Sequence, residues 1–137
     1  MKKAIIYSIL FLSLSLFFSC SSDDDNVPNN SNFDELIIGQ WKRTALTVDG
    51  ATSQSHCATD FKVTFGPDEH YGESPFDGSS CTSTGNTGTY TITGSELIIM
   101  SGFFSRVAEI TTLNESTFQY SYTNLSNESI KHTYSKL

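Results

Sequence analysis

The sequence predicts an all-β protein, an eight-stranded antiparallel barrel whose strands run up and down in chain order. Apolar residues alternate with polar ones in several short runs, turn-forming residues separate these runs, and no long helical pattern lies between them. Short hairpins make consecutive strands antiparallel, and eight such strands can close into a barrel that leaves no edge exposed. An open sandwich of two sheets is the alternative architecture.

Residues 1–19 have the features of a secretory signal, with two lysines near the start and an apolar stretch too short to span a bilayer comfortably. The small residue Ser19 just before Cys20 resembles the bacterial lipoprotein box, although Phe17 stands where that family usually has an aliphatic residue. The resemblance implies cleavage before Cys20, a diacylglycerol on its thiol and N-acylation. Several acyl chains hold a domain at a membrane, whereas one is marginal. An ordinary signal peptide with a chance cysteine is the alternative.

Residues 20–32 are a polar, acidic segment that cannot bury a core, and we expect a disordered linker there. Its first part resembles the export signal of surface lipoproteins in some Gram-negative bacteria. That resemblance implies a lipid-anchored protein of the outer membrane that faces the cell surface, with the periplasmic face as the alternative. The signal consists of Ser21, Ser22, Asp23, Asp24 and Asp25.

The acidic composition argues against a nucleic-acid partner. The formal net charge of the chain is -7, from 8 basic and 15 acidic residues. Without Lys2 and Lys3, which belong to the signal, six basic residues face 15 acidic ones, a net charge of -9. Such a surface repels phosphate backbones. The partner that the sequence does indicate is a membrane, through the lipid anchor, and no pattern indicates an oligomeric state.

The remaining residues, 33–137, are the size of one domain and carry the barrel. The segment 33–38 predicts a short turn, at most one helical turn, over one end of the barrel. The first strand follows within residues 36–48, which contain the only tryptophan of the chain. We expect Gly39 and Trp41 to plug that end.

Seven further strands are predicted from alternating apolar and polar residues and from the turn residues between them. Their order in the chain, with short links, gives the up-and-down barrel. The predicted strands are 61–65, 70–76, 88–93, 96–100, 103–111, 118–122 and 130–134.

The run from Gly39 to Trp41, followed by this meander, resembles lipocalins. The closer similarity is to the lipocalin-like domains of small lipoproteins of Gram-negative bacteria, on Cys57 to Phe61, Cys81 and the run Gly88 to Ile92. It covers about residues 36–137 and implies a binder of a small apolar or amphipathic ligand. Lipocalins usually also carry a Thr-Asp-Tyr-like loop motif and an arginine over the tryptophan, where this chain offers only Lys136.

Cys57 and Cys81 are predicted to form a disulfide, because such bonds persist in exported domains. The hairpin of strands 61–65 and 70–76 would bring the two cysteines together. His56 and His70 raise the alternative of a metal site, but no further ligand has suitable spacing, so we expect neither metal nor cofactor.

No pattern in the chain predicts an enzyme, and a hydrolase is the weakest hypothesis. No serine stands in a nucleophile elbow, and the loop 85–88 has no following helix that would make a phosphate cradle. Glu96 and Glu109 could face one another, but solvated strand-face charges are the simpler interpretation.

Aromatic residues at alternate strand positions have two interpretations. They fill the core, or they line an apolar pocket whose tyrosine hydroxyls bind a ligand. The first interpretation favours a structural or protein-interaction lipoprotein, such as an inhibitor or adhesion accessory; the second favours ligand binding. A cavity of at least about 300 Å³ would favour a ligand. The candidate pocket residues are Phe61, Phe65, Tyr90, Phe118, Tyr120, Tyr122, His132 and Tyr134.

Overall fold

The computed structural model describes residues 32–78, 80–81, 85–102 and 104–137. The predicted signal peptide, the predicted lipidation site Cys20 and the acidic tract 21–25 therefore lie outside the described residues. Within the described part of the chain, no helix has the length and apolar character needed to cross a membrane.

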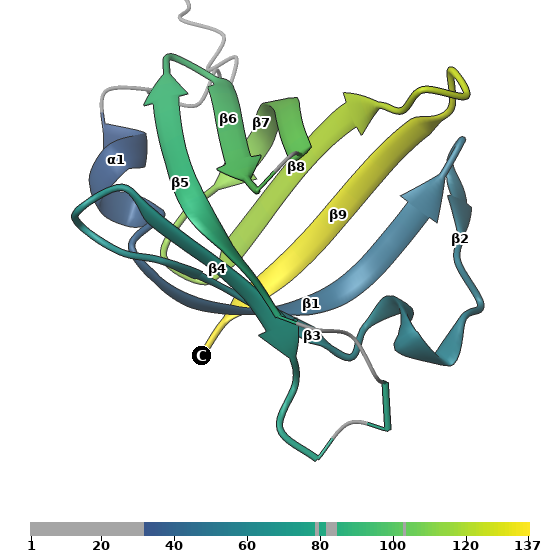
Figure 1. Ribbon diagram of the computed structural model, residues 1–137. Helices are drawn as coiled ribbons and strands as arrows, with labels where there is room; N and C mark the ends of the chain where they lie inside the picture. Colours follow the sequence, from purple (N-terminus) through teal and green to yellow (C-terminus); the bar gives the residue numbers. More distant parts are fainter. Residues whose placement is uncertain (1–31, 79, 82–84, 103) are drawn as a thin grey trace, which may run out of the picture.

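The described residues form a closed antiparallel β-barrel, which confirms the predicted fold class (Figure 1). Strands pair in the order β2-β1-β3-β4-β5-β6-β7-β8-β9, and β1 also pairs with β9. That last pairing closes the barrel and excludes the open sandwich. The elements are α1 (Phe33–Leu36), β1 (Gly39–Val48), β2 (Ala51–Thr52), the 3-10 helix η2 (His56–Ala58), β3 (Phe61–Phe65), β4 (His70–Pro75), β5 (Asn86–Thr93), β6 (Glu96–Ser101), β7 (Phe104–Leu113), β8 (Thr117–Thr123) and β9 (Ser129–Lys136).

Two elements were not predicted from the sequence. The two-residue strand β2 folds back on the end of β1, where Thr47 pairs with Thr52. The helix η2 follows it and carries Cys57 toward the start of β3. Both are too short to produce a periodic pattern, so only the eight barrel strands left a signal in the sequence.

Aromatic rings fill the middle of the barrel, because alternate residues of each strand point inward. Phe118 on β8 is fully buried and lies at the centre of this packing. Its ring centroid is 5.6 Å from those of Trp41 and Phe65 and 5.5 Å from that of Tyr134. Burying a side chain of this size stabilises the fold by roughly 2 to 3 kcal/mol.

The helix α1 and Trp41 close one end of the barrel. The indole Nε1 donates a hydrogen bond to the carbonyl oxygen of Ile37 at 2.7 Å. The ammonium group of Lys136 lies 4.6 Å from the centroid of the indole ring and donates to the carbonyl oxygens of Leu36 and Ile38. Lys136 thus provides the cation over the tryptophan that lipocalins usually draw from an arginine.

Gly39 is needed at this end for two reasons. Its φ of +131° is a backbone conformation that residues with a Cβ rarely adopt, and an added Cβ would lie 3.0 Å from Cε of Lys136. The glycine therefore lets the last strand and its lysine approach the indole.

Candidate functional site

The wall of the barrel opens between β7 and β8. Residues 104–109 of β7 pair with β6, but β7 pairs with β8 only from Glu109, opposite Ser121, onward. Figure 1 shows β8 and β9 diverging from β6 and β7 beyond this point. The β7–β8 ladder also shifts register between Ile110 and Thr112, and such a bulge bends a strand and increases its twist. The bulge therefore accounts for the divergence of the two strands.

The opening forms a groove of about 550 Å³, which we call the side groove. Residues 104–107 of β7 line one flank, and residues 122–126 of β8 and the following loop line the other. Phe104, Val107 and Leu125 give it exposed apolar surface. The side groove is therefore an amphipathic site lined by residues from two diverging strands.

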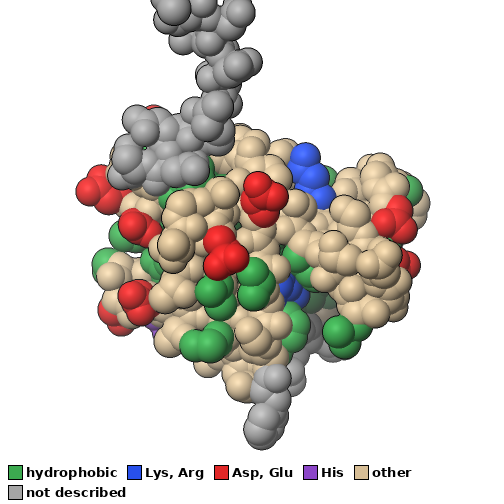
Figure 2. Space-filling model, turned by 90° about the horizontal axis from the view of Figure 1, so that it is seen from above, with side chains coloured by type: hydrophobic (Ala, Val, Ile, Leu, Met, Phe, Trp, Pro, Cys, Tyr) green, Lys and Arg blue, Asp and Glu red, His purple; other side chains and the backbone are tan. Residues whose placement is uncertain are grey.

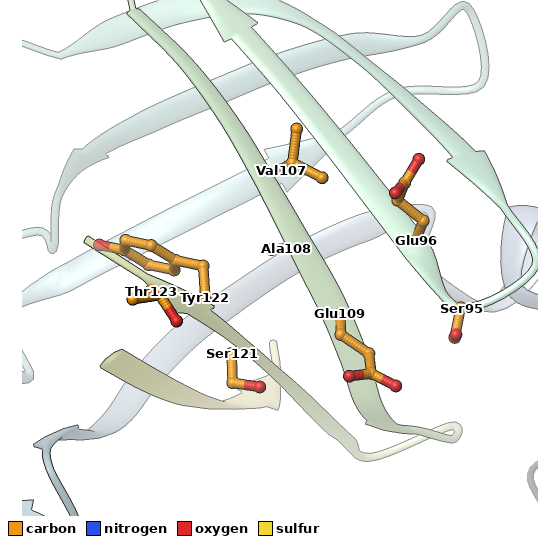
Figure 3. Close-up of a pocket in the computed structure, with 8 residues that line it drawn as sticks. All are labelled: Ser95, Glu96, Val107, Ala108, Glu109, Ser121, Tyr122 and Thr123. Carbon is orange, nitrogen blue, oxygen red and sulfur yellow. The ribbon is translucent and has the colours of Figure 1, made fainter. Parts of the chain in front are cut away.

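A second hollow of about 420 Å³ adjoins the side groove and shares Val107, Tyr122 and Thr123 with it (Figure 3). Its acidic side chains, Glu96 and Glu109, are directly opposite each other on β6 and β7 and are both exposed. They belong to the outer surface, which agrees with the interpretation that they are solvated strand-face charges.

Arg106 lies on the floor of the side groove and is held in one orientation by three aromatic side chains. Its Nη1 donates a hydrogen bond to the hydroxyl of Tyr120 at 3.0 Å. Its Cζ lies 4.5 Å from the ring centroid of Tyr122 and 4.7 Å from that of Phe104. The Nε atom is buried and has no hydrogen-bond partner among the described residues. The guanidinium is thus held in place, but not all of its hydrogen-bond donors have an acceptor.

On its inner side, Arg106 borders a smaller cavity of about 160 Å³ inside the barrel. This cavity also contacts Glu73 of β4, whose carboxylate accepts a hydrogen bond from the hydroxyl of Tyr71 at 3.0 Å. The cavity is too small for a lipid-sized ligand, because ligand pockets typically have about 300 to 1,000 Å³.

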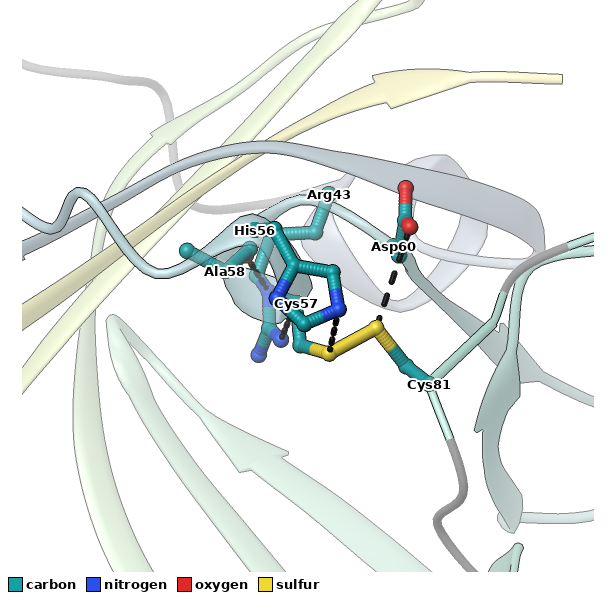
Figure 4. The surroundings of a disulfide bond; sticks show 6 residues. All are labelled: Arg43, His56, Cys57, Ala58, Asp60 and Cys81. Atoms are coloured by element: carbon teal, nitrogen blue, oxygen red, sulfur yellow. Dashed lines mark hydrogen bonds between the residues drawn. A yellow bond between two sulfur atoms is a disulfide. The ribbon is translucent and has the colours of Figure 1, made fainter.

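A second arginine, Arg43, is buried and completes the interior polar cluster. Its Nε donates to the carbonyl oxygen of Ala58, and this contact appears beside the disulfide in Figure 4. Its Nη1 lies 3.9 Å from Oε1 of Glu73 and 3.4 Å from Nδ1 of His132. Arg43 therefore pairs with the carboxylate that the cluster contains and also fixes the orientation of η2.

His132 is neutral in this cluster. Nδ1 accepts from Arg43, which has no acceptor atom, and the hydroxyl of Tyr134 lies 3.2 Å from it, so the ring proton must reside on Nε2. Burial, with Arg43 and Arg106 nearby, lowers the pKa of His132 to about 3. Burial also raises the pKa of Tyr120 and of Tyr134, so these hydroxyls stay protonated. Nε2 of His132 has no partner among the described residues.

The predicted disulfide between Cys57 and Cys81 is confirmed, with Cα atoms 5.7 Å apart (Figure 4). It joins η2 to the segment after β4. His56 Nε2 lies 3.3 Å from Sγ of Cys57, and Asp60 Oδ2 lies 3.8 Å from Sγ of Cys81. Among the described residues, His56, Cys57 and Cys81 form the one group with three metal-ligand atoms within 4.8 Å. Both sulfurs are bonded to each other, and metals bind thiolates, so the oxidised protein offers no thiolate there.

The candidate pocket residues lie mostly in the packed interior. Phe65, Phe118, Tyr120 and Tyr134 are at most 1% exposed and their rings pack against one another, so they fill the barrel. Tyr122 lines the side groove. The others have different surroundings: Tyr90 donates to the carbonyl of Gly66, Phe61 lies under Arg43 with its centroid 4.6 Å from Cζ, and His132 belongs to the polar cluster.

Sequence reasoning missed Arg43 and Arg106. Both occupy inward positions, two residues from the inward Trp41 and Ala108 respectively. That spacing is the available signal, but it is a weak one because charged strand residues usually face water.

Comparison with known proteins supports the same architecture. A family profile described as a lipocalin-like domain matches residues 37–120. A lipocalin-like protein from Bacteroides uniformis has a similar structure, with a TM-score of 0.58 and 14% identity over 74% of this chain and 98% of that chain. An uncharacterized protein from Bacteroides eggerthii gives a TM-score of 0.56 and 14% identity over 74% of this chain and 99% of that chain. No curated protein sequence matches.

Proposed function

This chain belongs to the lipocalin-like domain family, and from that membership we propose that it binds a small amphipathic molecule in the side groove. The observation that carries the proposal is the opening between β7 and β8, whose volume of about 550 Å³ is in the range of small-molecule sites. Aromatic side chains fill the centre of the barrel, and the inner cavity described above, at about 160 Å³, is much smaller than the side groove. Binding alone involves no chemical reaction, so the proposed function is not that of an enzyme.

The chemistry of the side groove indicates what kind of molecule fits. Phe104 and Leu125 are 48% and 108% exposed, so their apolar surface contacts water in the free protein and is available to a ligand. Ser105, Thr123 and Ser126 give the same groove a polar rim. A ligand with an apolar body and a polar end would bury the first set and satisfy the second.

The test uses the neutral dye N-phenyl-1-naphthylamine, whose fluorescence rises in apolar surroundings. The wild-type protein should bind it saturably at a one-to-one ratio. Leu125→Ser should weaken binding, because it removes apolar surface from the groove. Leu137→Ser changes another exposed leucine, outside the groove, and should not weaken binding. Equal effects of the two variants, or no saturable binding, would reject the side groove as the site.

Trp41 is a poor reporter for this titration, because it is fully buried and does not line the side groove. A tryptophan introduced as Phe104→Trp, in a Trp41→Phe background, places the reporter at the groove instead. Its emission should shift to shorter wavelength when the dye-free protein is titrated with a long-chain alcohol. An unchanged spectrum at saturating alcohol would contradict the proposed location.

We further propose that lipid on Cys20 anchors the protein to the outer membrane, with the barrel displayed on the cell surface. The support is the lipoprotein-like sequence around Cys20 and the acidic tract after it. Cys20→Ser should abolish labelling by an alkyne fatty acid and release the protein from membranes. Ser21→Ala should keep the labelling and the membrane attachment. Alanine at Asp23, Asp24 and Asp25 together should reduce protease access on intact cells, and unchanged access would favour another export signal.

A protein partner is the second candidate function. Exposed apolar side chains gather near the opening, with Met100 and Val107 each 56% exposed, and Figure 2 shows apolar side chains among scattered acidic ones on the face seen from above. The unpaired edges of β7 and β8 could also accept an extended segment as an added strand. Protection from hydrogen exchange at residues 104–108 by a bound protein, with no response to small amphiphiles, would favour this function.

A further inference from the structure

Among the described residues, the interior of the barrel and the floor of the side groove together carry one positive charge more than they neutralise. The guanidinium groups of Arg43 and Arg106 face a single carboxylate, that of Glu73, while His132 is neutral and Tyr71 and Tyr120 stay protonated. Glu73 is the direct partner of Arg43, at 3.9 Å. Arg106 contacts a neutral hydroxyl and two aromatic ring faces.

An excess charge in such surroundings is costly unless an anion accompanies it. Arg106 is half-buried, and a half-buried charge without an anionic partner is solvated less well than a charge in open water. Aromatic faces attract a cation but do not neutralise it. Arg106 therefore has an electrostatic requirement that the described residues meet only in part.

The position of Arg106 connects this requirement to the side groove. Its side chain borders both the side groove and the inner cavity that it shares with Glu73. The rings of Phe104 and Tyr122 both pack against the guanidinium and restrain it, and Nε remains without a hydrogen-bond partner among the described residues. A guanidinium held in this way presents a rigid fork of donors that matches the two oxygens of a carboxylate.

We propose that the side groove selects amphiphiles with a single carboxylate, and that Arg106 binds this group while the ligand's apolar part lies along Phe104, Val107 and Leu125. The inference rests on the proposed ligand-binding function and adds the chemical class of the ligand to it. One negative charge on the ligand matches the one excess positive charge inside the barrel. A dianionic group would reverse the imbalance.

The test compares decanoate with 1-decanol, which has the same chain and no charge, by titration calorimetry at pH 8. The wild-type protein should bind decanoate at least about ten-fold more tightly, as expected for a charge-assisted hydrogen bond. Arg106→Gln should remove this preference while keeping the affinity for 1-decanol. Lys131→Gln makes the same change of charge on an outward position of β9 and should keep the preference.

The outcomes separate this inference from the proposed function. If both ligands bind the wild-type protein equally, the carboxylate selectivity is wrong and the ligand-binding function stands. If neither ligand binds, both are wrong. If Arg106→Gln fails to fold in a thermal melt, Arg106→Lys keeps the charge but loses the fork, and should retain only part of the preference; a preference as large as that of the wild type would overturn the bidentate contact.

Discussion

Lowering the pH from 8 to 5 should destabilise the fold by about 2 kcal/mol through one side chain, His132. Its pKa is about 3 in the folded protein, because it is buried near Arg43 and Arg106, and 6.5 in the unfolded chain. Between these two values the unfolded chain binds a proton that the folded protein does not. Stability is therefore complete above about pH 6.5 and declines as the pH falls toward 3.

The assay is urea unfolding at pH 8, 6.5 and 5 with the disulfide intact, followed by the fluorescence of the buried Trp41. His132→Gln keeps an acceptor for Nη1 of Arg43 but has no group that titrates. Its free energy of unfolding should start lower and then fall about 2 kcal/mol less than that of the wild type over this pH range. His70→Gln, which replaces an exposed histidine on β4, should follow the wild type.

The comparison of variants isolates the histidine, because every protein of the set carries the same carboxylates. Equal losses in the wild type and in His132→Gln would refute the assignment of a buried, neutral His132. A loss that disappears in His70→Gln instead would place the pH sensitivity on the surface of the barrel.

Three further variants test the packing. Trp41→Ala should reduce the free energy of urea unfolding by about 3 to 5 kcal/mol, because it empties the closed end and removes the ring under Lys136; a loss below 1 kcal/mol would argue against a packed plug. Reducing the disulfide between Cys57 and Cys81, which are 24 residues apart, should cost about 3 to 4 kcal/mol without loss of the β-sheet circular dichroism signal. Glu96→Lys should raise the melting temperature, because it replaces a like-charge pair with Glu109 by an opposite-charge pair.

The hairpins could be predicted from the sequence because their turns contain residues that tolerate unusual backbone angles. Gly94 has φ of +61° between β5 and β6, Gly102 has +59° between β6 and β7, and Asn127 has +63° before β9. Glycine and asparagine adopt this conformation at little cost. The alternation in β3 was equally clear, and its bounds agree with the prediction.

The side groove could not be predicted, because it depends on where a ladder stops. Whether β7 stays paired with β8 beyond Glu109 is decided by the bulge after Ile110 and by the path of the whole hairpin β8–β9. Neither leaves a periodic signal in the chain. The same holds for Arg43 and Arg106: their inward positions could be read from spacing, but the groups that make burial tolerable lie on other strands.

The aromatic residues illustrate why a correct fold prediction left the site open. Rings at alternate positions are expected both for a filled barrel and for an apolar pocket, since both need large apolar side chains inside. The choice depends on whether rings from different strands meet. Here Phe118 contacts rings from β1, β3 and β9, so the space is taken and the accessible volume lies in the wall.

The distribution of charge then determines how an anionic ligand can be selected at all. The chain has a formal net charge of -7, and Glu96 and Glu109 lie beside the side groove, so the field outside the barrel repels a carboxylate. At physiological salt this repulsion is screened beyond about 8 Å, whereas the contact with Arg106, which packs against two aromatic rings, is screened far less. Selectivity for a carboxylate must therefore arise at contact and not by steering. Added salt should strengthen the binding of such a ligand, the reverse of its effect on an anion held by a cationic surface patch.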